Sequence, residues 1–222
     1  MRNAIPRVYA ILDTAALGRL NFHPVDFAAA LLEGGARIVQ FRHKDFWSRD
    51  VFAQASAIAE LCREAGAVFV VNDRADYAAL LHAGLHLGQE DLSPRDARSV
   101  AGDGLLGFST HNAEQMRAAG AEPVDYVAFG PVFPTGSKER PDPVTGLEGL
   151  RQVRALTEKP LVAIGGITLE NAPLCWDAGA DSVAVISALI PQPCTHRGVR
   201  ECMELWAKSA VNYAPAADPN CS

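Results

Sequence analysis

One phrase recurs along this chain and limits the folds that it can adopt. A helical pattern ends at a Gly-Ala pair and a short apolar run follows, at Gly35-Ala36, Gly66-Ala67, Gly120-Ala121 and Gly179-Ala180. A glycine just past a helix end supplies the left-handed cap, and a β-branched run is typical of a strand buried on both faces. The repeat therefore predicts successive units of a parallel α/β protein.

The remaining elements complete the pattern. An amphipathic helix is expected between Ser48 and Ala65, and Ser93-Pro94 and Asn112 are typical helix starts. Strands are expected at residues 7–13, 37–42, 68–72, 84–88, 104–109, 126–130, 161–165 and 182–186. So many strands alternating with helices favour a single closed (β/α)₈ TIM barrel over an open doubly wound sheet, which usually has fewer strands and leaves edges to protect.

Composition narrows the class of protein. We expect one barrel domain over residues 1–210 and a disordered tail over residues 211–222. The net charge of -6 and the lack of a basic block argue against nucleic-acid binding. The apolar runs are shorter than a membrane span and we expect no signal peptide, which indicates a cytoplasmic protein. The cysteines are scattered, so we expect reduced thiols. A small-molecule ligand is expected in place of a nucleic acid. The sequence leaves a homo-oligomer open.

Polar side chains gather at the expected carboxyl ends of the strands, where barrels of this kind carry their chemistry. Gln40, Arg42 and Lys44 share one face at a two-residue period, while His43 points the other way. The other expected strands are followed by Asn72-Asp73, Glu90-Asp91, Ser109, Thr135 with Ser137 and Lys138, Gly165-Gly166 and Ser187.

Two anion sites follow from these residues. Gly165-Gly166 allows backbone N–H groups to approach an anion, and Ser187 adds a hydroxyl at the start of a short helical turn, as in a barrel monophosphate site. The second set mixes cations with carboxylates, which suits a diphosphate chelated to Mg²⁺. Its members are Arg42, Lys44 and Lys138 with Asp73 and one of Glu90 or Asp91, between which the residues alone do not choose. Two ligands, one with a diphosphate leaving group, indicate group transfer.

Several motifs in order resemble those of the thiamine-phosphate synthase family, also called thiamine-phosphate pyrophosphorylase, over roughly residues 7–190. They are Gln-Phe-Arg-His-Lys at 40–44, Asn72-Asp73, His-Leu-Gly-Gln-Glu-Asp at 86–91, Gly-Phe-Ser-Thr-His at 107–111, Gly-Pro-Val-Phe-Pro-Thr-Gly-Ser-Lys at 130–138, Ala-Ile-Gly-Gly-Ile at 163–167 and Val-Ile-Ser at 185–187. Position 43 is His where the family commonly has an acid, and the interval between the two metal-binding acids is one residue shorter than usual.

The resemblance implies a transferase that joins an aminopyrimidine carrying a methylene diphosphate to a thiazole phosphate and releases pyrophosphate. It implies Mg²⁺ on Asp73 and Asp91. For such a transfer we expect Arg42, Lys44 and Lys138 to be catalytic, because they can offset the charge that grows on the departing diphosphate. The residues implied to hold the pyrimidine diphosphate are Gln40, Arg42, Lys44, Asn72, Ser109 and Lys138. Those implied to hold the thiazole phosphate are Thr135, Gly136, Ser137, Gly166, Ile186 and Ser187.

Three other functions stay open at this point. A thiazole tautomerase of the same superfamily would need neither a diphosphate cage nor a metal pair. A non-catalytic barrel that binds a phosphate ligand could keep Gly166 and Ser187 without Asp73 or Lys138. A sugar-phosphate epimerase would need a pair of acid and base residues, and no such pair stands out.

Overall fold

The computed structural model describes residues 5–136 and 143–213. Its strands are parallel and pair in chain order, and β8 returns to pair with β1, so that the sheet closes into a barrel. The strands are β1 (Val8–Asp13), β2 (Ile38–Arg42), β3 (Val68–Asn72), β4 (Gly84–Leu87), β5 (Leu106–Thr110), β6 (Tyr126–Phe129), β7 (Leu161–Ile164) and β8 (Ser182–Val185). This confirms the single (β/α)₈ barrel, with each strand within two residues of its expected bounds at either end.

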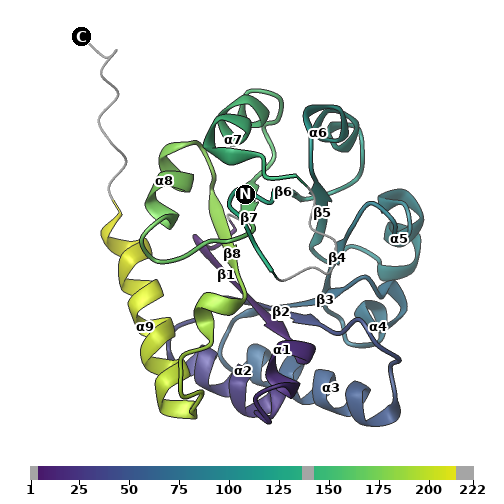
Figure 1. Ribbon diagram of the computed structural model, residues 1–222. Coiled ribbons are helices and arrows are strands. Elements are labelled where there is room, and N and C mark those ends of the chain that lie inside the picture. The colour runs from purple at the N-terminus through teal and green to yellow at the C-terminus, as the bar shows by residue number, and fades with distance from the viewer. Residues whose placement is uncertain (1–4, 137–142, 214–222) are drawn as a thin grey trace.

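Helices surround the barrel on the outside (Figure 1). They are α1 (Thr14–Gly18), α2 (Pro24–Glu33), α3 (Arg49–Glu64), α4 (Ala75–Leu80), α5 (Pro94–Ala101), α6 (Ala113–Gly120), α7 (Gly146–Arg154), α8 (Ala172–Asp177) and α9 (His196–Asn212), with a 3₁₀ turn, η1 (Ser187–Leu189), after β8. The predicted starts hold, because the side chains of Ser93 and Asn112 accept hydrogen bonds from Asp96 N and Gln115 N.

Two apolar layers follow from the alternation of side chains along each strand. One set, including Leu12 and Phe41, points outward and packs against the helices. The other set, including Ile11, Ile38 and Val70, points into the barrel. The inner set is interrupted toward the carboxyl ends of the strands by polar side chains, so this end of the barrel carries the candidate site.

Glycine caps explain how α2, α3 and α8 pass directly into strands. Gly35, Gly66 and Gly179 have left-handed φ values of 99°, 64° and 98°, and each following alanine donates back to a carbonyl in the last turn of the helix, as in a Schellman motif. The prediction of the same cap at Gly120 was wrong. Ala121 ends α6 with a φ of -87°, and residues 122–125 separate it from β6, so the chain needs no immediate reversal there.

The C-terminal helix extends further than the sequence indicates. α9 ends at Asn212, and the ring of Tyr213 lies 4.9 Å from that of Trp176, with its hydroxyl donating to Asp177 at 2.7 Å. Residues 211–213 of the expected tail are therefore ordered, and residues 214–222 lie outside the described part of the chain. Within that part, no helix is both long and apolar enough to cross a bilayer.

Candidate active site

Two carboxylates meet at the carboxyl ends of β3 and β4. Asp73 follows β3 with a φ of 66°, and it lines one pocket together with Asp91. Burial and this acidic neighbour raise the pKa of Asp73 to about 6, although the ammonium group of Lys44 opposes the shift. Asp91 also accepts a hydrogen bond from Gly88 N at 2.6 Å, whereas Glu90 is exposed. The structure thus distinguishes the two acids between which the sequence did not choose.

The cations of β2 lie beside this pair. Lys44 Nζ is 2.5 Å from Asp73 Oδ2. Arg42 forms an ion pair with Asp13, the last residue of β1, and Asp13 also accepts a hydrogen bond from Ala16 N at 2.8 Å. Because Asp13 is only 7% exposed and is fixed by the start of α1, it holds the Arg42 guanidinium in place.

Sequence reasoning missed Asp13, although the rule that selected Asp73 applies to it equally. It is a carboxylate at the carboxyl end of a barrel strand, and it shares a face with the inward-pointing Ile11. His43 takes the opposite direction, as predicted. Its Nδ1 lies 2.8 Å from the hydroxyl of Thr14, and its ring packs 5.9 Å from that of Trp47.

The neutral polar residues of the expected pyrimidine site also point inward. Gln40 and Asn72 are 2% and 5% exposed. The amide nitrogen of Asn72 is buried and has no hydrogen-bond partner among the described residues, which leaves a donor for a ligand. Ser109 lies 2.9 Å from His86 Nε2. His86 is buried and hydrogen-bonded, as the sequence indicates.

The loop after β6 forms the wall next to β7. Val132 N and Phe133 N donate to Ile164 O and Gly165 O at 2.9 and 3.0 Å, so the loop continues the pairing of the two strands. At Gly166, whose φ is 63°, a Cβ atom would lie 2.4 Å from Pro134 O, so only glycine allows this approach.

The other residues of the expected thiazole site border this wall or β8. Thr135 and Gly136 follow on the loop, Ile186 directly follows β8, and Ser187 opens the predicted helical turn η1. Ser137 and Lys138 lie outside the described residues.

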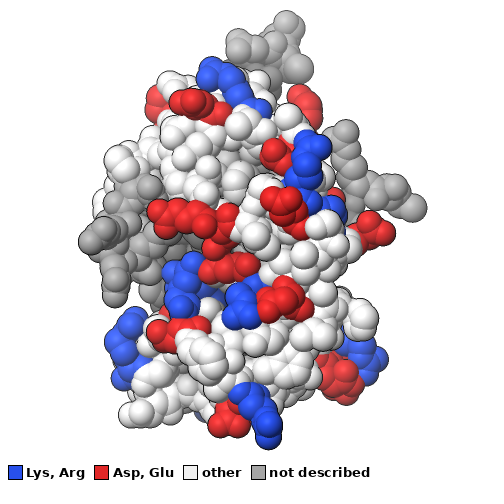
Figure 2. All heavy atoms as spheres, turned by 90° about the vertical axis from the view of Figure 1, so that its right-hand side faces the viewer, with Lys and Arg blue, Asp and Glu red and all other residues white. Residues whose placement is uncertain are grey.

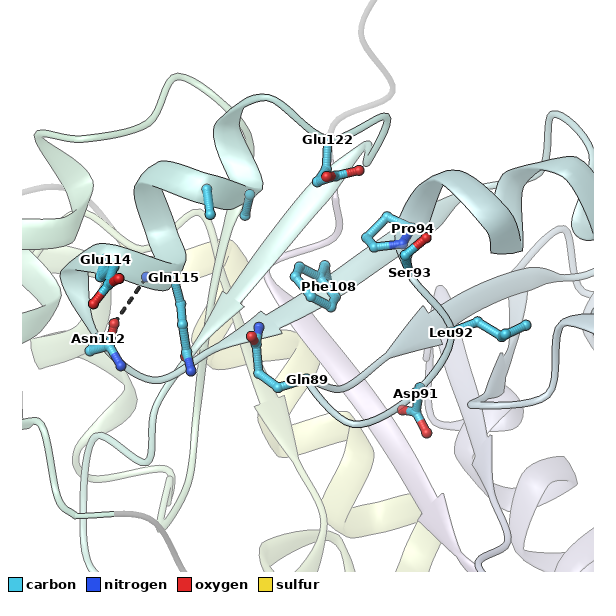
Figure 3. Close-up of a pocket in the computed structure, with 12 residues that line it drawn as sticks. Gln89, Asp91, Leu92, Ser93, Pro94, Phe108, Asn112, Glu114, Gln115 and Glu122 are labelled. Atoms are coloured by element: carbon cyan, nitrogen blue, oxygen red, sulfur yellow. Dashed lines mark hydrogen bonds between the residues drawn. The ribbon is translucent and has the colours of Figure 1, made fainter.

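Two pockets border the rim. The first, of about 550 Å³, lies between the loop that carries Gln89 and the helix α6, with Phe108 beside it (Figure 3). Among the expected site residues that the structure describes, only Asp91 lines it, so it flanks the barrel mouth on its outer side. The second, of about 490 Å³, is lined by both Asp73 and Asp91 and reaches Val100.

Charges of both signs are interspersed on the face that Figure 2 shows, on which no continuous basic surface is seen among the described residues. Acids and bases pair locally, as Arg74 and Asp76 do at 2.5 Å and Arg98 and Asp125 at 2.9 Å. Within the described ranges, no group of three or more His, Cys, Asp or Glu side chains is arranged around a common metal position.

A closed barrel with a carboxylate pair, two cations and a glycine-containing wall at the carboxyl ends of its strands is typical of barrel enzymes that act on small molecules. The family model for thiamine monophosphate synthase matches residues 8–189. The thiamine-phosphate synthase of Koribacter versatilis is 47% identical over 193 residues, which cover 85% of this chain and 91% of the relative. That of Methanoculleus marisnigri is 44% identical and covers 82% of this chain and 87% of the relative.

A solved structure of thiamine phosphate pyrophosphorylase from Pyrococcus furiosus superposes with a TM-score of 0.81 at 34% identity and covers 95% of this chain and 97% of its own. This chain belongs to the thiamine monophosphate synthase family. The resemblance and the expected transferase class are thereby confirmed, and thiamine-phosphate synthesis is supported over a tautomerase or a non-catalytic phosphate-binding barrel.

Proposed function

We propose that this chain joins an aminopyrimidine that carries a methylene diphosphate to the ring nitrogen of a thiazole phosphate, giving thiamine phosphate and pyrophosphate. The observation that carries the proposal is the meeting of Asp73 and Asp91 with Lys44 at the barrel rim, where Arg42 ends the strand that precedes Lys44. Such a cage suits a diphosphate with a divalent ion. A tautomerase, which moves only a proton, has no use for it.

The carboxylate pair suits Mg²⁺. Two neighbouring carboxyl groups repel one another when both are ionised, so they favour a proton or a cation between them, as the raised pKa of Asp73 reflects. Their oxygens are the hard ligands that Mg²⁺ prefers together with water and phosphate oxygens. Asp73 and Asp91 would hold the ion, and when bound it would offset negative charge on the diphosphate.

The hard step is the break between the pyrimidine methylene carbon and the diphosphate oxygen. The bonding electron pair leaves with the diphosphate, and the ring amino group donates electrons to the carbon left positive. The thiazole nitrogen then supplies the electron pair of the new bond to that carbon. Arg42, Lys44 and Lys138 are proposed to stabilise the charge that grows on the departing oxygens, an effect for which one donor is worth on the order of 10²–10³ in rate.

Arg42 is suited to this role because Asp13 fixes its orientation before a ligand arrives, so little reorganisation is needed. Asn72 offers its unpaired amide N–H to the same ligand, and Gln40 and Ser109 complete the proposed pyrimidine site. No protein nucleophile is required.

The thiazole phosphate is proposed to bind across the barrel mouth. Gly166, whose missing side chain lets the loop after β6 pack against it, is proposed to offer its backbone N–H to the phosphate. Ser187 opens the 3₁₀ turn η1, and we propose that its backbone N–H and its hydroxyl both donate to the phosphate. Further proposed contacts come from Thr135, Gly136, Ser137 and Ile186. Holding the thiazole nitrogen near the methylene carbon converts a bimolecular reaction into an effectively unimolecular one, which raises its rate.

The test mixes the purified protein with both substrates and measures pyrophosphate release and thiamine phosphate formation, with Mg²⁺ or with a chelator. We expect release only when both substrates and Mg²⁺ are present. Asp91→Asn should lower the rate on the order of 10²-fold, whereas Glu90→Gln, which removes the exposed neighbouring acid, should leave it unchanged. A wild-type protein that binds both substrates but releases no pyrophosphate would be a phosphate-ligand sensor, and the proposed function would fail.

A cytoplasmic location is in keeping with this function. Charged phosphate esters do not cross membranes unaided, and Cys62, Cys175, Cys194 and Cys202 are free thiols, as expected in a reducing compartment.

A further inference from the structure

A continuous line of hydrogen bonds crosses the barrel interior and joins two residues of the proposed pyrimidine site. Gln40 Nε2 donates to the Tyr9 hydroxyl at 3.0 Å. The Tyr9 and Tyr126 hydroxyls are 2.8 Å apart, and the Tyr126 hydroxyl lies 2.9 Å from His86 Nδ1. His86 Nε2 in turn lies 2.9 Å from the Ser109 hydroxyl. The line thus runs from β2 to β5 through β1, β6 and β4.

The amide at one end fixes the direction of every proton in this line. An amide nitrogen can only donate, so the Tyr9 oxygen accepts from Gln40. The buried Tyr9 proton needs an acceptor, and the Tyr126 oxygen is the remaining hydrogen-bond partner of Tyr9 among the described residues, so the proton is directed to Tyr126. Tyr126 then accepts from Tyr9 and donates to His86 Nδ1. A neutral imidazole that accepts at Nδ1 carries its proton on Nε2, and it donates that proton to Ser109.

The protons that this direction needs are retained. Burial raises the pKa of both Tyr9 and Tyr126 well above that of an exposed phenol, so each hydroxyl has a proton to donate at neutral pH.

The rings in this line are also held in place. The ring of Tyr126 stacks on that of His86 with centroids 5.6 Å apart and lies 5.9 Å from that of Tyr9. It occupies space that Gly107 leaves open, because a Cβ atom at Gly107 would be 2.0 Å from Tyr126 Cζ. Tyr9, Tyr126 and His86 are 1%, 0% and 7% exposed, so solvent does not compete for these hydrogen bonds.

We propose that Tyr9, Tyr126 and His86 are positioning residues that make Ser109 a hydrogen-bond donor to the pyrimidine diphosphate. Because the Ser109 oxygen accepts from His86, its own proton is free to point at an acceptor on the substrate. Without the line the hydroxyl could turn its proton toward His86 and present only lone pairs, which repel diphosphate oxygens. The substrate assigned to Ser109 rests on the proposed function, whereas the proton arrangement does not.

The first experiment therefore needs no substrate. In the ligand-free wild-type protein, ¹⁵N spectra of the imidazole rings, recorded at a pH above the usual titration of histidine, distinguish a protonated from an unprotonated ring nitrogen. The His86 signals are assigned by their absence in His86→Gln. We expect the proton on Nε2 and none on Nδ1. A proton on Nδ1 would mean that the line runs the other way, and it would overturn the inference whether or not the enzyme is active.

The second experiment removes one oxygen from the line. Tyr126→Phe keeps the aromatic ring in the space beside Gly107 but takes away the donor to His86 Nδ1. The His86 imidazole should then become a mixture of its two tautomers. We expect the dissociation constant of the pyrimidine diphosphate, measured by calorimetry, to rise about three- to tenfold, while that of the thiazole phosphate stays within about twofold.

A matched control lies on the same strand. Thr110 is fully buried beside Ser109, but its hydroxyl donates to the backbone of Ala128 at 2.9 Å. Thr110→Val also removes a buried hydrogen bond, and it should lower the melting temperature without changing the His86 tautomer or either affinity. If Tyr126→Phe leaves pyrimidine diphosphate binding unchanged, or weakens both ligands to the same extent as Thr110→Val, the positioning role is refuted.

Discussion

Asp73→Asn should stabilise the metal-free protein while it abolishes the proposed activity. Asparagine has the shape of the carboxylate without its charge, and it tolerates the left-handed backbone that Asp73 adopts with a φ of 66°. The variant therefore isolates the cost of placing a charge beside Asp91 in a partly buried position.

The size of the effect follows from the pKa of Asp73, which rises from its ordinary 3.8 to about 6. Each unit corresponds to about 1.4 kcal/mol, so the upper bound is about 3 kcal/mol. The side chain is 17% exposed, and solvent screening reduces the expected gain to about 1–2 kcal/mol at neutral pH. For a domain of this length the melting temperature should rise by about 2–8 °C.

The pH dependence gives the prediction its sign. A carboxyl group whose pKa is higher in the folded state favours folding when it is protonated, and this contribution is lost as the pH rises through about 6. Wild-type protein and variant should therefore be equally stable near pH 4 and diverge between about pH 4 and pH 6, with the variant the more stable above this window.

Urea unfolding with a chelator present, repeated across this pH window, measures the difference. Asp76→Asn is the control, since the guanidinium of Arg74 lowers the pKa of Asp76 and its neutralisation should destabilise the fold or leave it unchanged. Added Mg²⁺ should stabilise the wild type but not Asp73→Asn. A variant no more stable than the wild type at neutral pH, or one whose gain persists below pH 4, would refute the electrostatic reasoning.

Three further predictions concern other parts of the site. Lys138→Ala should slow the chemical step by on the order of 10²-fold and weaken pyrimidine diphosphate binding less. Single-turnover rates and equilibrium binding measure the two effects, and weakened binding with an unchanged rate would reject the catalytic role. Gly107→Ala should lower the free energy of unfolding by about 1–3 kcal/mol through its clash with Tyr126, and an unchanged urea midpoint would contradict this. Asp13→Asn should release Arg42 and lower kcat/KM about tenfold, and steady-state kinetics with an unaltered rate would exclude this role.

Much of the fold was predictable because the strands and helices of a barrel of this type are specified by patterns among residues close together in the sequence. The two-residue alternation placed Gln40 inside the barrel and His43 outside it, and the glycines after α2, α3 and α8 marked the ends of helices that feed directly into strands. The pattern failed at Gly120, because a longer connection removes the need for a left-handed cap.

The candidate site was predictable as a list of residues and not as a set of pairs. Sequence position indicates that Lys44 and Asp73 stand at one rim, but their ion pair depends on how far each loop folds back. The contact between Tyr9 and Tyr126 is harder still to predict from the sequence. Each reads as one apolar position of a buried strand, and their hydroxyls meet across 117 positions of chain only when the barrel closes.

The polar centre of the barrel has a consequence for how the sheet is assembled. An alternating apolar strand that slips by two residues keeps its inner and outer faces, so aliphatic packing alone specifies the stagger between neighbouring strands weakly. A slip of that size at β4 or β5 would part His86 from Tyr126 or set a bulkier residue where Gly107 stands. The buried side chains that position Ser109 would then also select one shear, that is, one stagger between neighbouring strands, for the closed barrel.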